Sequence, residues 1–473
     1  MKSHKSTVLN MTEGSAISLL IRFSIPMLIG NLFQQVYNLV DSVIVGQFVG
    51  ADALAAVGAT NSITFLFFAL CNGIGNGGGI ITSQFFGRNS RDEVKSCIMN
   101  TAYIMLVVPL TVGITAFFLS KPLLLLLDTP EAILADSLSY FRVMCVSIVF
   151  VSLYNFSSAM LRALGDSRTP LYFLIFSCFL NAGLDVLFVC GLGTGVKGAA
   201  IATSIAQFVS GFACLTYAVL KNEYFKMTKA DLAFNRKITL QVIKLGVPLS
   251  LQFALIAISC MALQKVVNSY GKTAVAAFTA TSRVEQIIHQ PYQTLGAALS
   301  TFTGQNYGAR KMDRVNTGCK KGLLLMFVFS CCMLPVMQLF SNNIVSIFVS
   351  DADVIAMGGN ALKITSWFYV MLGLIYVVRG VLNGLGDSLF ALLNGIVEVL
   401  GRFTVPILLT GIPAIGVWGI WWSVSIVWSV SGITAWIRYI IYKKKLQISG
   451  NKECLEPHKL SFRPHMCPVG KAR

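Results

Sequence analysis

The stretch IPMLIGNLFQQVYNLVDSVIVGQFVG, residues 25–50, has the length and apolar composition of a membrane-spanning helix. Two of its residues depart from that description. Asp41 places a carboxylate among hydrocarbon, which is costly, so such residues are rare and usually functional. Pro26 removes one backbone hydrogen bond and gives the helix a place to bend. An acid and a bend on one helix together predict an element that couples cation binding to movement.

The composition of the chain is that of an all-α polytopic membrane protein. Of its 473 residues, 55% are hydrophobic and 12% are charged, and the mean hydropathy is +0.70. Soluble domains carry about 25% charged residues. Several apolar segments exceed the ~20 residues that a span needs, which predicts tilt or bending. Twelve transmembrane helices are expected, near residues 18–45, 55–85, 97–119, 135–160, 170–190, 198–220, 240–269, 274–302, 318–340, 356–381, 389–410 and 417–442.

The net charge of +17 follows from topology and does not indicate nucleic-acid binding. Alternate loops hold most of the Lys and Arg residues, and the loops between them hold most of the acids. By the positive-inside rule, the basic loops and both termini are expected in the cytoplasm. The first apolar run is longer than a signal-peptide core, so it is interpreted as a retained transmembrane helix.

An internal repeat divides the chain into two halves. A shift of 221 positions places Gly50 on Gly271 and Gln84 on Gln305, and it places LGDS at 164–167 on LGDS at 385–388. Six spans per repeat give both halves the same orientation, as in secondary transporters that bind substrate between two lobes. Duplication kept only for folding is the alternative. The predicted division is an N-terminus at 1–17, an N-lobe at 18–220, a linker at 221–239, a C-lobe at 240–442 and a cytoplasmic tail, interpreted as disordered, at 443–473.

Polar residues on four helices of the N-lobe are expected at one depth. Asp41 lies roughly 34 Å along the first helix at 1.5 Å per residue, in the outer half of the membrane. Asn181 and Asp185 share a helix face in the same outer half. Tyr140 and Thr203 fall at similar depth. Paired carboxylates can carry a proton, and the oxygens of Asp41, Asn181, Asp185 and Thr203 suit Na⁺ as well. Isolated structural hydrogen bonds near the membrane boundary are the alternative.

The C-lobe lacks this acid cluster, because the 221 shift places Arg402 on Asn181 and Pro406 on Asp185. It has a candidate polar site of its own, formed by Arg283, Glu285, His289, Glu398 and Arg402. The i, i+4 spacing of Glu398 and Arg402 favours a mutually neutralising ion pair, with a substrate-contacting or gating pair as the functional alternative. His289, beside a proline, is more often structural than titrating.

Other motifs are explained without a cofactor or an enzyme. The cysteines lack the spacing of a disulfide framework or a zinc site. Cys454, His458, His465 and Cys467 fall in the tail. The run GIGNGGGI at 73–80 lies inside an apolar helix and predicts close helix packing, not a phosphate loop. Short loops leave no room for a soluble catalytic domain, and the chain carries no paired-His motif or Ser/His/Asp arrangement. An enzyme is therefore not expected.

These segments resemble the MATE (multidrug and toxic compound extrusion) transporters. The resemblance is carried by PMLIGNLFQQVYNLVDSVIVGQFVGADALAAVG, FFGRN, LRALGDSRTP and NAGLDVLFVCGLGTGVKGAAIATSIAQ, and it extends to about residue 445. It implies a monomeric inner-membrane antiporter, associated with antibiotic resistance, that exports cationic or zwitterionic organic compounds against inward flow of H⁺ or Na⁺ and needs no cofactor.

The family's N-lobe cation site carries over to Asp41, Tyr140, Asn181, Asp185 and Thr203, with Pro26 at the bend of the first helix. Some members carry an acid in helix 7, where this chain has Ile256, so coupling is assigned to the N-lobe. The alternative within the superfamily is a flippase for a lipid-linked saccharide or another amphipathic lipid, which would be expected to line its cavity with several cations. A passive channel would not explain the acid cluster.

Overall fold

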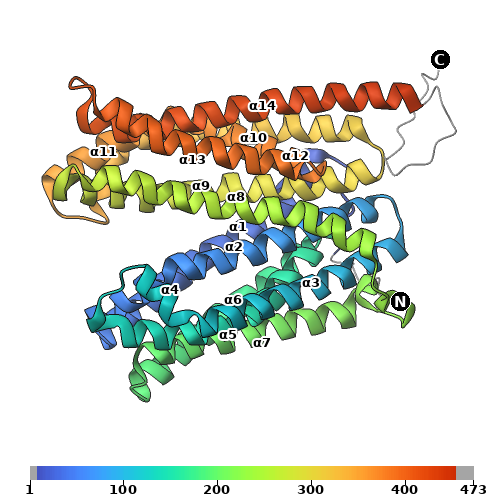
Figure 1. Ribbon diagram of the computed structural model, residues 1–473. Helices are drawn as coiled ribbons and strands as arrows, with labels where there is room; N and C mark the ends of the chain where they lie inside the picture. Colours follow the sequence, from blue (N-terminus) through green and yellow to red (C-terminus); the bar gives the residue numbers. More distant parts are fainter. Residues whose placement is uncertain (1–7, 454–473) are drawn as a thin grey trace.

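The structure is a computed structural model that describes residues 8–453 (Figure 1). Every regular element in that range is helical. The α-helices are α1 (Ala16–Phe48), α2 (Ala51–Gly87), α3 (Arg91–Phe118), α4 (Ser120–Leu126), α5 (Glu131–Ala163), α6 (Arg168–Asp185), α7 (Gly195–Lys221), α8 (Arg236–Asn268), α9 (Gly271–Gly308), α10 (Met312–Ser346), α11 (Ala352–Ser366), α12 (Tyr369–Gly384), α13 (Ser388–Thr410) and α14 (Gly419–Glu453). A π-helix, η1 (Val186–Gly191), continues α6, and the 3₁₀ turns are η2 (Glu223–Phe225), η3 (Ala230–Leu232) and η4 (Gly416–Trp418).

Among the described residues, ten helices are long and apolar enough to cross a membrane, and the pair α11 and α12, bent by 53° at their junction, gives an eleventh span. The twelfth predicted span is α9, which has 38 residues but carries Arg283, Glu285 and His289 among its apolar residues. The sequence did not predict the short α4 or the break in the tenth span. α14 continues to Glu453, beyond residue 442, where its end was expected. The tail residues with cysteine and histidine lie outside the described range.

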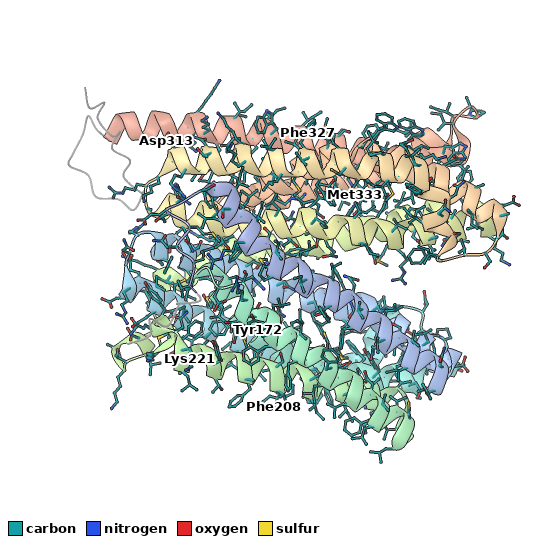
Figure 2. The ribbon with its side chains drawn as sticks, turned by 180° about the vertical axis from the view of Figure 1, so that it is seen from behind. Tyr172, Phe208, Lys221, Asp313, Phe327 and Met333 are labelled. Atoms are coloured by element: carbon teal, nitrogen blue, oxygen red, sulfur yellow. The ribbon has the colours of Figure 1, made fainter. Side chains whose placement is uncertain are left out.

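The twelve spans form two six-helix bundles. In Figure 1 the first six spans, coloured blue to green, lie below the last six, coloured yellow-green to red. The start of α1 and the end of α14 lie at the same end of the molecule, which we call the termini end, and α4 and α11 lie at the opposite end. The bundles are closest at the termini end. From behind, α1 runs obliquely from beside the C-lobe at this end into the N-lobe at the other (Figure 2).

The outer surface of both bundles is apolar. Tyr172 and Phe208 on the N-lobe and Phe327 on the C-lobe are 64%, 44% and 53% exposed. Figure 2 shows Phe208 and Phe327 on opposite outer faces, whereas the charged Lys221 and Asp313 lie at the termini end. A soluble protein rarely exposes so much contiguous apolar surface. The apolar outer surface of the two bundles is therefore the surface that contacts lipid.

The glycine run at 73–80 brings α2 close to α8. A β-carbon added at Gly73 would lie 2.1 Å from Ser250 Oγ, and one added at Gly77 would lie 2.6 Å from the backbone nitrogen of Gly246. Gly78 faces Thr101 of α3 in the same way, at 2.4 Å. Small residues of this kind let membrane helices approach closely. The structure therefore confirms the helix-packing interpretation of this motif.

Replacing Gly77 by Ala is expected to lower the stability of the protein. The added methyl group would collide with the backbone of α8, and overpacking of this kind costs about 1–3 kcal/mol. Gly58→Ala in the same helix is the matched control, because nothing lies within 4 Å of a β-carbon there. Thermal unfolding in detergent measures both variants. A melting temperature for Gly77→Ala at or above that of Gly58→Ala would contradict the assigned packing.

At the termini end, the two lobes are joined by a pair of contacts related by the internal repeat. Gln84 Nε2 of α2 donates to the Gly384 carbonyl at 2.9 Å, and Gln305 Nε2 of α9 donates to the Ala163 carbonyl at 3.0 Å. Both the donors and the acceptors are 221 positions apart. We call these two bonds the glutamine clasp. Gly87 and Gly308 permit it, because a β-carbon at either would lie 1.8 Å from a carbonyl of the other lobe.

The chain preceding α1 reinforces one half of the glutamine clasp. Met11 is fully buried, and its backbone nitrogen donates to Gln305 Oε1 at 2.9 Å. The Met11 carbonyl accepts from Asn306 Nδ2 and from Arg314 Nη2, each at 3.1 Å. Gln305 thus connects the N-terminal segment, the C-lobe and the N-lobe through one side chain.

The segment between the lobes is held against α3 of the N-lobe. Lys95 Nζ lies 3.0 Å from Asp231 Oδ2, and the Asn100 side chain accepts from the backbone nitrogen of Asn235 at 2.8 Å. Hydrogen bonds from Thr228, with Lys95 alongside, lower the pKa of the Asp231 carboxyl to about 2. The stabilisation from the contacts of Asp231 is therefore present above the ordinary carboxyl pKa of about 4 and is lost as pH falls through about 2.

Candidate functional site

The five polar residues predicted at one depth of the N-lobe converge in the structure on the space between α1, α5, α6 and α7. Asp185 is fully buried, and Asn181, Tyr140 and Thr203 are 1%, 8% and 9% exposed. Asp41 is half-buried. Four separate helices therefore contribute to one cluster, which we call the N-lobe acid site.

The position of α6 is set by the LGDS motif that precedes it. The Asp166 carboxylate accepts hydrogen bonds from the backbone nitrogens of Arg168 and Thr169, at 3.1 and 3.0 Å, and from the Thr169 hydroxyl at 2.7 Å. These bonds satisfy donors that the first turn of a helix leaves free. Asn181 and Asp185, one turn apart, then lie on the face of α6 that is turned into the lobe.

Asn181 connects the acid to α7. With its amide nitrogen facing the carboxylate, it donates to Asp185 Oδ2 at 2.8 Å, and its oxygen accepts from the Thr203 backbone nitrogen at 3.2 Å. The α-helical part of α6 ends at Asp185, and the π-helix η1 begins at the next residue. Single π-turns of this kind are frequent at functional sites, because they redirect side chains within a helix.

Asp41 and Asp185 bring two carboxyl groups together from α1 and α6. The groups lie beside each other, so that one can donate a hydrogen bond to the other once it carries a proton. One buried oxygen of each, Asp41 Oδ1 and Asp185 Oδ1, has no hydrogen-bond donor among the described residues. Two carboxylates in this arrangement repel each other, and a proton or a small cation between them removes the repulsion.

Tyr37 belongs to the same site, although the sequence analysis did not select it. It lies one helical turn before Asp41, and its hydroxyl is 3.3 Å from Thr203 Oγ1. Tyr37 and Tyr140 both lie close enough to the two acids to interact with them electrostatically. The signal was present in the sequence, because residues spaced i and i+4 share a helix face.

Apolar side chains enclose the acid site on the side away from the termini end. Ile44, Val45, Val189 and Val196 pack together with Tyr140 in one buried cluster. A low local dielectric strengthens the repulsion between unpaired like charges and the attraction of a bound cation. In these surroundings, the charge state of Asp41 and Asp185 therefore affects how α1 packs against α6.

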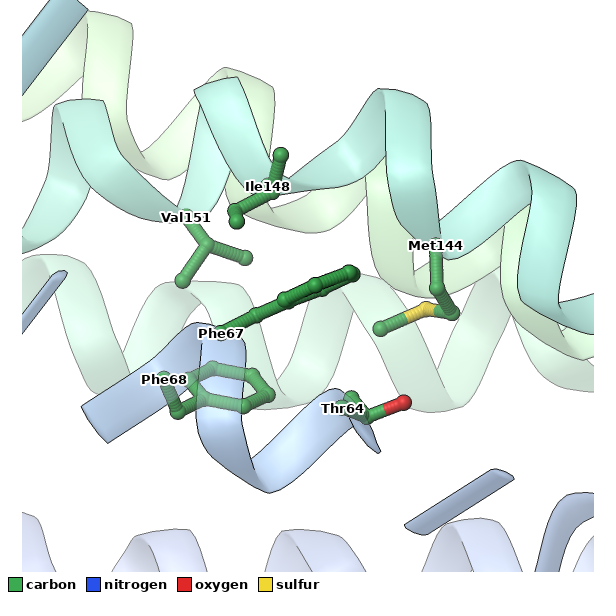
Figure 3. Close-up of a pocket in the computed structure, with 6 residues that line it drawn as sticks. All are labelled: Thr64, Phe67, Phe68, Met144, Ile148 and Val151. Carbon is green, nitrogen blue, oxygen red and sulfur yellow. The ribbon is translucent and has the colours of Figure 1, made fainter. Parts of the chain in front are cut away.

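A small apolar pocket lies deeper in the N-lobe. Figure 3 shows its lining, which comes from α2 and α5: Thr64, Phe67, Phe68, Met144, Ile148 and Val151. The Phe67 ring stacks on Phe141 with centroids 5.9 Å apart. The lining of the pocket is therefore apolar apart from the Thr64 hydroxyl.

Pro26 lies within α1, which continues through it without interruption, so the predicted bend remains a prediction.

The polar residues of the C-lobe are arranged differently from the prediction. Glu398 forms an ion pair with Arg379 of α12, and Arg379 Nη2 also donates to Asn394 Oδ1 at 2.5 Å. Arg402 instead donates to Ser259 Oγ at 3.2 Å and Cys260 Sγ at 2.9 Å. The expected Glu398–Arg402 pair is therefore replaced by a bond between helices. The sequence analysis missed Arg379, although any charge within a span is a candidate.

Glu285 and His289 lie one turn apart on α9 inside the C-lobe. Glu285 lies beside Thr365, and the His289 ring packs edge-on against Trp428, with centroids 5.5 Å apart. Arg283, on the same helix, is exposed and lies apart from this interior face. The structure thus brings two of the three predicted α9 residues into the lobe.

Known proteins match this chain in both of its halves. The MatE family model matches residues 26–187 and again residues 248–406, so each half of the chain matches it separately. The chain is 32% identical over 391 residues to the "Probable multidrug resistance protein YpnP" of Bacillus subtilis, covering 82% of this chain and 87% of that protein. It is 27% identical to the "Probable multidrug resistance protein YoeA" of the same organism, covering 90% and 94%.

Solved structures share the fold. A structure described as MATE in the straight conformation superposes with a TM-score of 0.88 at 23% identity, covering 94% of this chain and all of that one. One described as the outward-facing conformation of a multidrug resistance MATE family transporter gives the same TM-score, identity and coverage.

Proposed function

Because this chain belongs to the MatE family, whose members are transporters and not enzymes, we propose that it is a cation-coupled multidrug antiporter. It exports cationic or zwitterionic organic compounds by alternating access, in exchange for H⁺ or Na⁺. The observation that carries the proposal is the pair Asp41 and Asp185, contributed by two helices, each with a buried oxygen that has no donor in the described part of the chain. The relatives named as multidrug resistance proteins support drug export as the activity.

The coupling step follows from the electrostatics of the acid pair. Two carboxylates about 4 Å apart repel by roughly 4 kcal/mol at an effective dielectric constant of 20. Without a cation, this repulsion favours separation of α1 from α6. A proton or Na⁺ bound between Asp41 and Asp185, with Asn181 and Thr203 supplying further oxygens, draws the helices together. The resulting shift of α1 changes the shape of the N-lobe and promotes release of the drug.

The glutamine clasp closes one end of the transport path. We assign the termini end to the cytoplasm, because the basic loops lie there. The clasp then holds the lobes together on the cytoplasmic side, and the conformation seen here is the one closed to the cytoplasm. Opening toward the cytoplasm requires both bonds to break, together with the contacts of Met11.

The double variant Gln84→Ala, Gln305→Ala is expected to shift the population toward the state open to the cytoplasm. Two hydrogen bonds of about 1 kcal/mol each correspond to a shift of roughly 30-fold in the equilibrium. Distances between spin labels on the termini ends of the two lobes measure it. Gln264→Ala is the matched control, because Gln264 bonds only to Asn268 of its own helix, at 2.8 Å. An unchanged distance distribution in the double variant would contradict a role for the clasp in gating.

The proposed function is tested by efflux of a fluorescent organic cation from proteoliposomes under an imposed pH gradient and, separately, an imposed Na⁺ gradient. One gradient is expected to drive efflux. If neither gradient drives efflux, the result favours the lipid-flippase alternative. Movement of a labelled lipid-linked saccharide between the two leaflets is then the assay that tests it. The acid pair of the N-lobe favours the antiporter, since a pyrophosphate headgroup would require basic residues.

A further inference from the structure

The interior of the C-lobe contains a second group of polar atoms that have no hydrogen-bond partner within residues 8–453. They are Glu285 Oε1, His289 Nε2, Tyr369 Oη and Arg402 Nε, all buried, from α9, α12 and α13. The groups are neighbours: Arg402 acts electrostatically on both Glu285 and His289, and Tyr369 interacts with Glu285. Buried polar atoms are nearly always hydrogen-bonded, so four in one place call for an explanation.

Opposite charges in this group are not paired with each other. Glu285 lies beside Thr365, while Arg402 donates to Ser259 and Cys260. No ion pair between Glu285 and Arg402 is present in the described part of the chain. The nearby Arg379 and Glu398 are, by contrast, joined in an ion pair. A carboxylate and a guanidinium that are neighbours without forming an ion pair suit a ligand that carries both signs of charge.

The internal repeat makes this group of C-lobe residues the counterpart of the residues that line the N-lobe pocket. A shift of 221 positions carries the six lining residues of the pocket in Figure 3 onto Glu285, Ile288, His289, Thr365, Tyr369 and Leu372. Arg402 occupies the place of Asn181. Its partners on α8, Ser259 and Cys260, match the part of α1 that holds Tyr37. The pocket of the N-lobe is therefore apolar and lies beside an acid pair, whereas the equivalent residues of the C-lobe include polar groups of both charges.

We propose that this C-lobe group binds zwitterionic organic substrates. The ligand's carboxylate binds the Arg402 guanidinium, its ammonium group faces Glu285, and its ring system lies against His289 and Trp428. The proposal rests on the proposed export function and adds a specific subsite to it. A simple organic cation has no carboxylate for Arg402, so its recognition does not depend on that residue.

The test compares binding of two probes to purified protein, ethidium as a monocation and norfloxacin as a zwitterion. Arg402→Gln is expected to weaken norfloxacin binding about tenfold or more, which is the loss of one charge-assisted hydrogen bond, and to leave ethidium binding within about twofold. Arg402→Lys keeps the charge but lacks the planar guanidinium. Its norfloxacin affinity is expected to lie between that of Arg402→Gln and that of the unmodified protein. Arg283→Gln, an exposed arginine on α9, is the matched control.

Equal norfloxacin affinity in Arg402→Gln and the unmodified protein would overturn the proposal, as would an equal loss of both probes. If Arg402→Gln does not fold, Arg402→Lys carries the test, with a loss of norfloxacin binding and unchanged ethidium binding expected. Gradient-driven ethidium efflux by the unmodified protein, together with no norfloxacin binding, would overturn this subsite and leave the export function standing. Absence of ethidium efflux under both ion gradients would instead count against the export function itself.

Discussion

Replacing Asp41 by Asn is expected to reduce gradient-driven efflux of an organic cation to the leak of protein-free liposomes. The amide has nearly the size of the carboxylate and still forms hydrogen bonds, but it neither takes up a proton nor balances Na⁺. The repulsion that drives α1 and α6 apart disappears, and with it the response to the coupling cation. The same loss is expected for Asp185→Asn. Efflux from proteoliposomes under each imposed ion gradient measures both variants.

An exposed acid of the same lobe provides the control for this experiment. Asp136 of α5 is exposed, and Asp136→Asn is expected to retain efflux. The melting temperatures of the Asp41 and Asp185 variants should equal or exceed that of the unmodified protein, since each change relieves repulsion. Full efflux by both Asp41→Asn and Asp185→Asn would refute the assignment of coupling to this site.

Replacing Arg379 by Met is expected to lower the stability of the protein more than any other single substitution predicted for this chain. Glu398 is 5% exposed, and the variant leaves its charge without a counter-ion inside the lobe. Breaking a buried ion pair by removing one partner costs about 3–5 kcal/mol. Gln252 and Asn394, which also face the Arg379 side chain, lose their partner at the same time. Thermal unfolding in detergent measures the change.

The double variant Arg379→Met, Glu398→Met separates charge burial from packing. It removes both charges and is expected to recover most of the lost stability, because an apolar pair of similar volume is often neutral in place of a buried ion pair. Arg88→Met breaks the exposed pair with Glu93 and is expected to change stability by less than about 1 kcal/mol. A single variant as stable as the double variant would show that Glu398 does not need Arg379.

Hydropathy and the internal repeat were sufficient to predict the architecture. Spans such as α5 and α7 lie within a few residues of their predicted positions, because a membrane requires long apolar helices with satisfied backbones. The break between α11 and α12 was not predicted, since no proline lies at the junction of Ser366 and Tyr369. The glutamine clasp was also not predicted, although the internal repeat pairs Gln84 with Gln305. Repeat position alone does not say what a side chain contacts.

Depth along the spans predicted the N-lobe acid site, because ionisable residues are so rare in a membrane that each one is informative. Tyr37 was not predicted as part of this site because tyrosine is common in such helices. In the C-lobe, the spacing of Glu398 and Arg402 suggested a partner on the same helix, whereas packing placed Arg379 of a different helix beside Glu398. Contacts within a helix follow from sequence spacing, but contacts between helices depend on rotation and crossing that one sequence does not display.

The most direct test of the acid pair as the coupling site is ion movement driven by the drug. Proteoliposomes with an imposed gradient of an organic cation are monitored for H⁺ with an internal pH dye and for ²²Na⁺ by uptake. The unmodified protein is expected to move one of the two ions opposite to the drug, and Asp41→Asn and Asp185→Asn are expected to move neither. Drug-driven ion movement by Asp185→Asn at the unmodified rate would place the coupling cation somewhere other than between these two carboxylates.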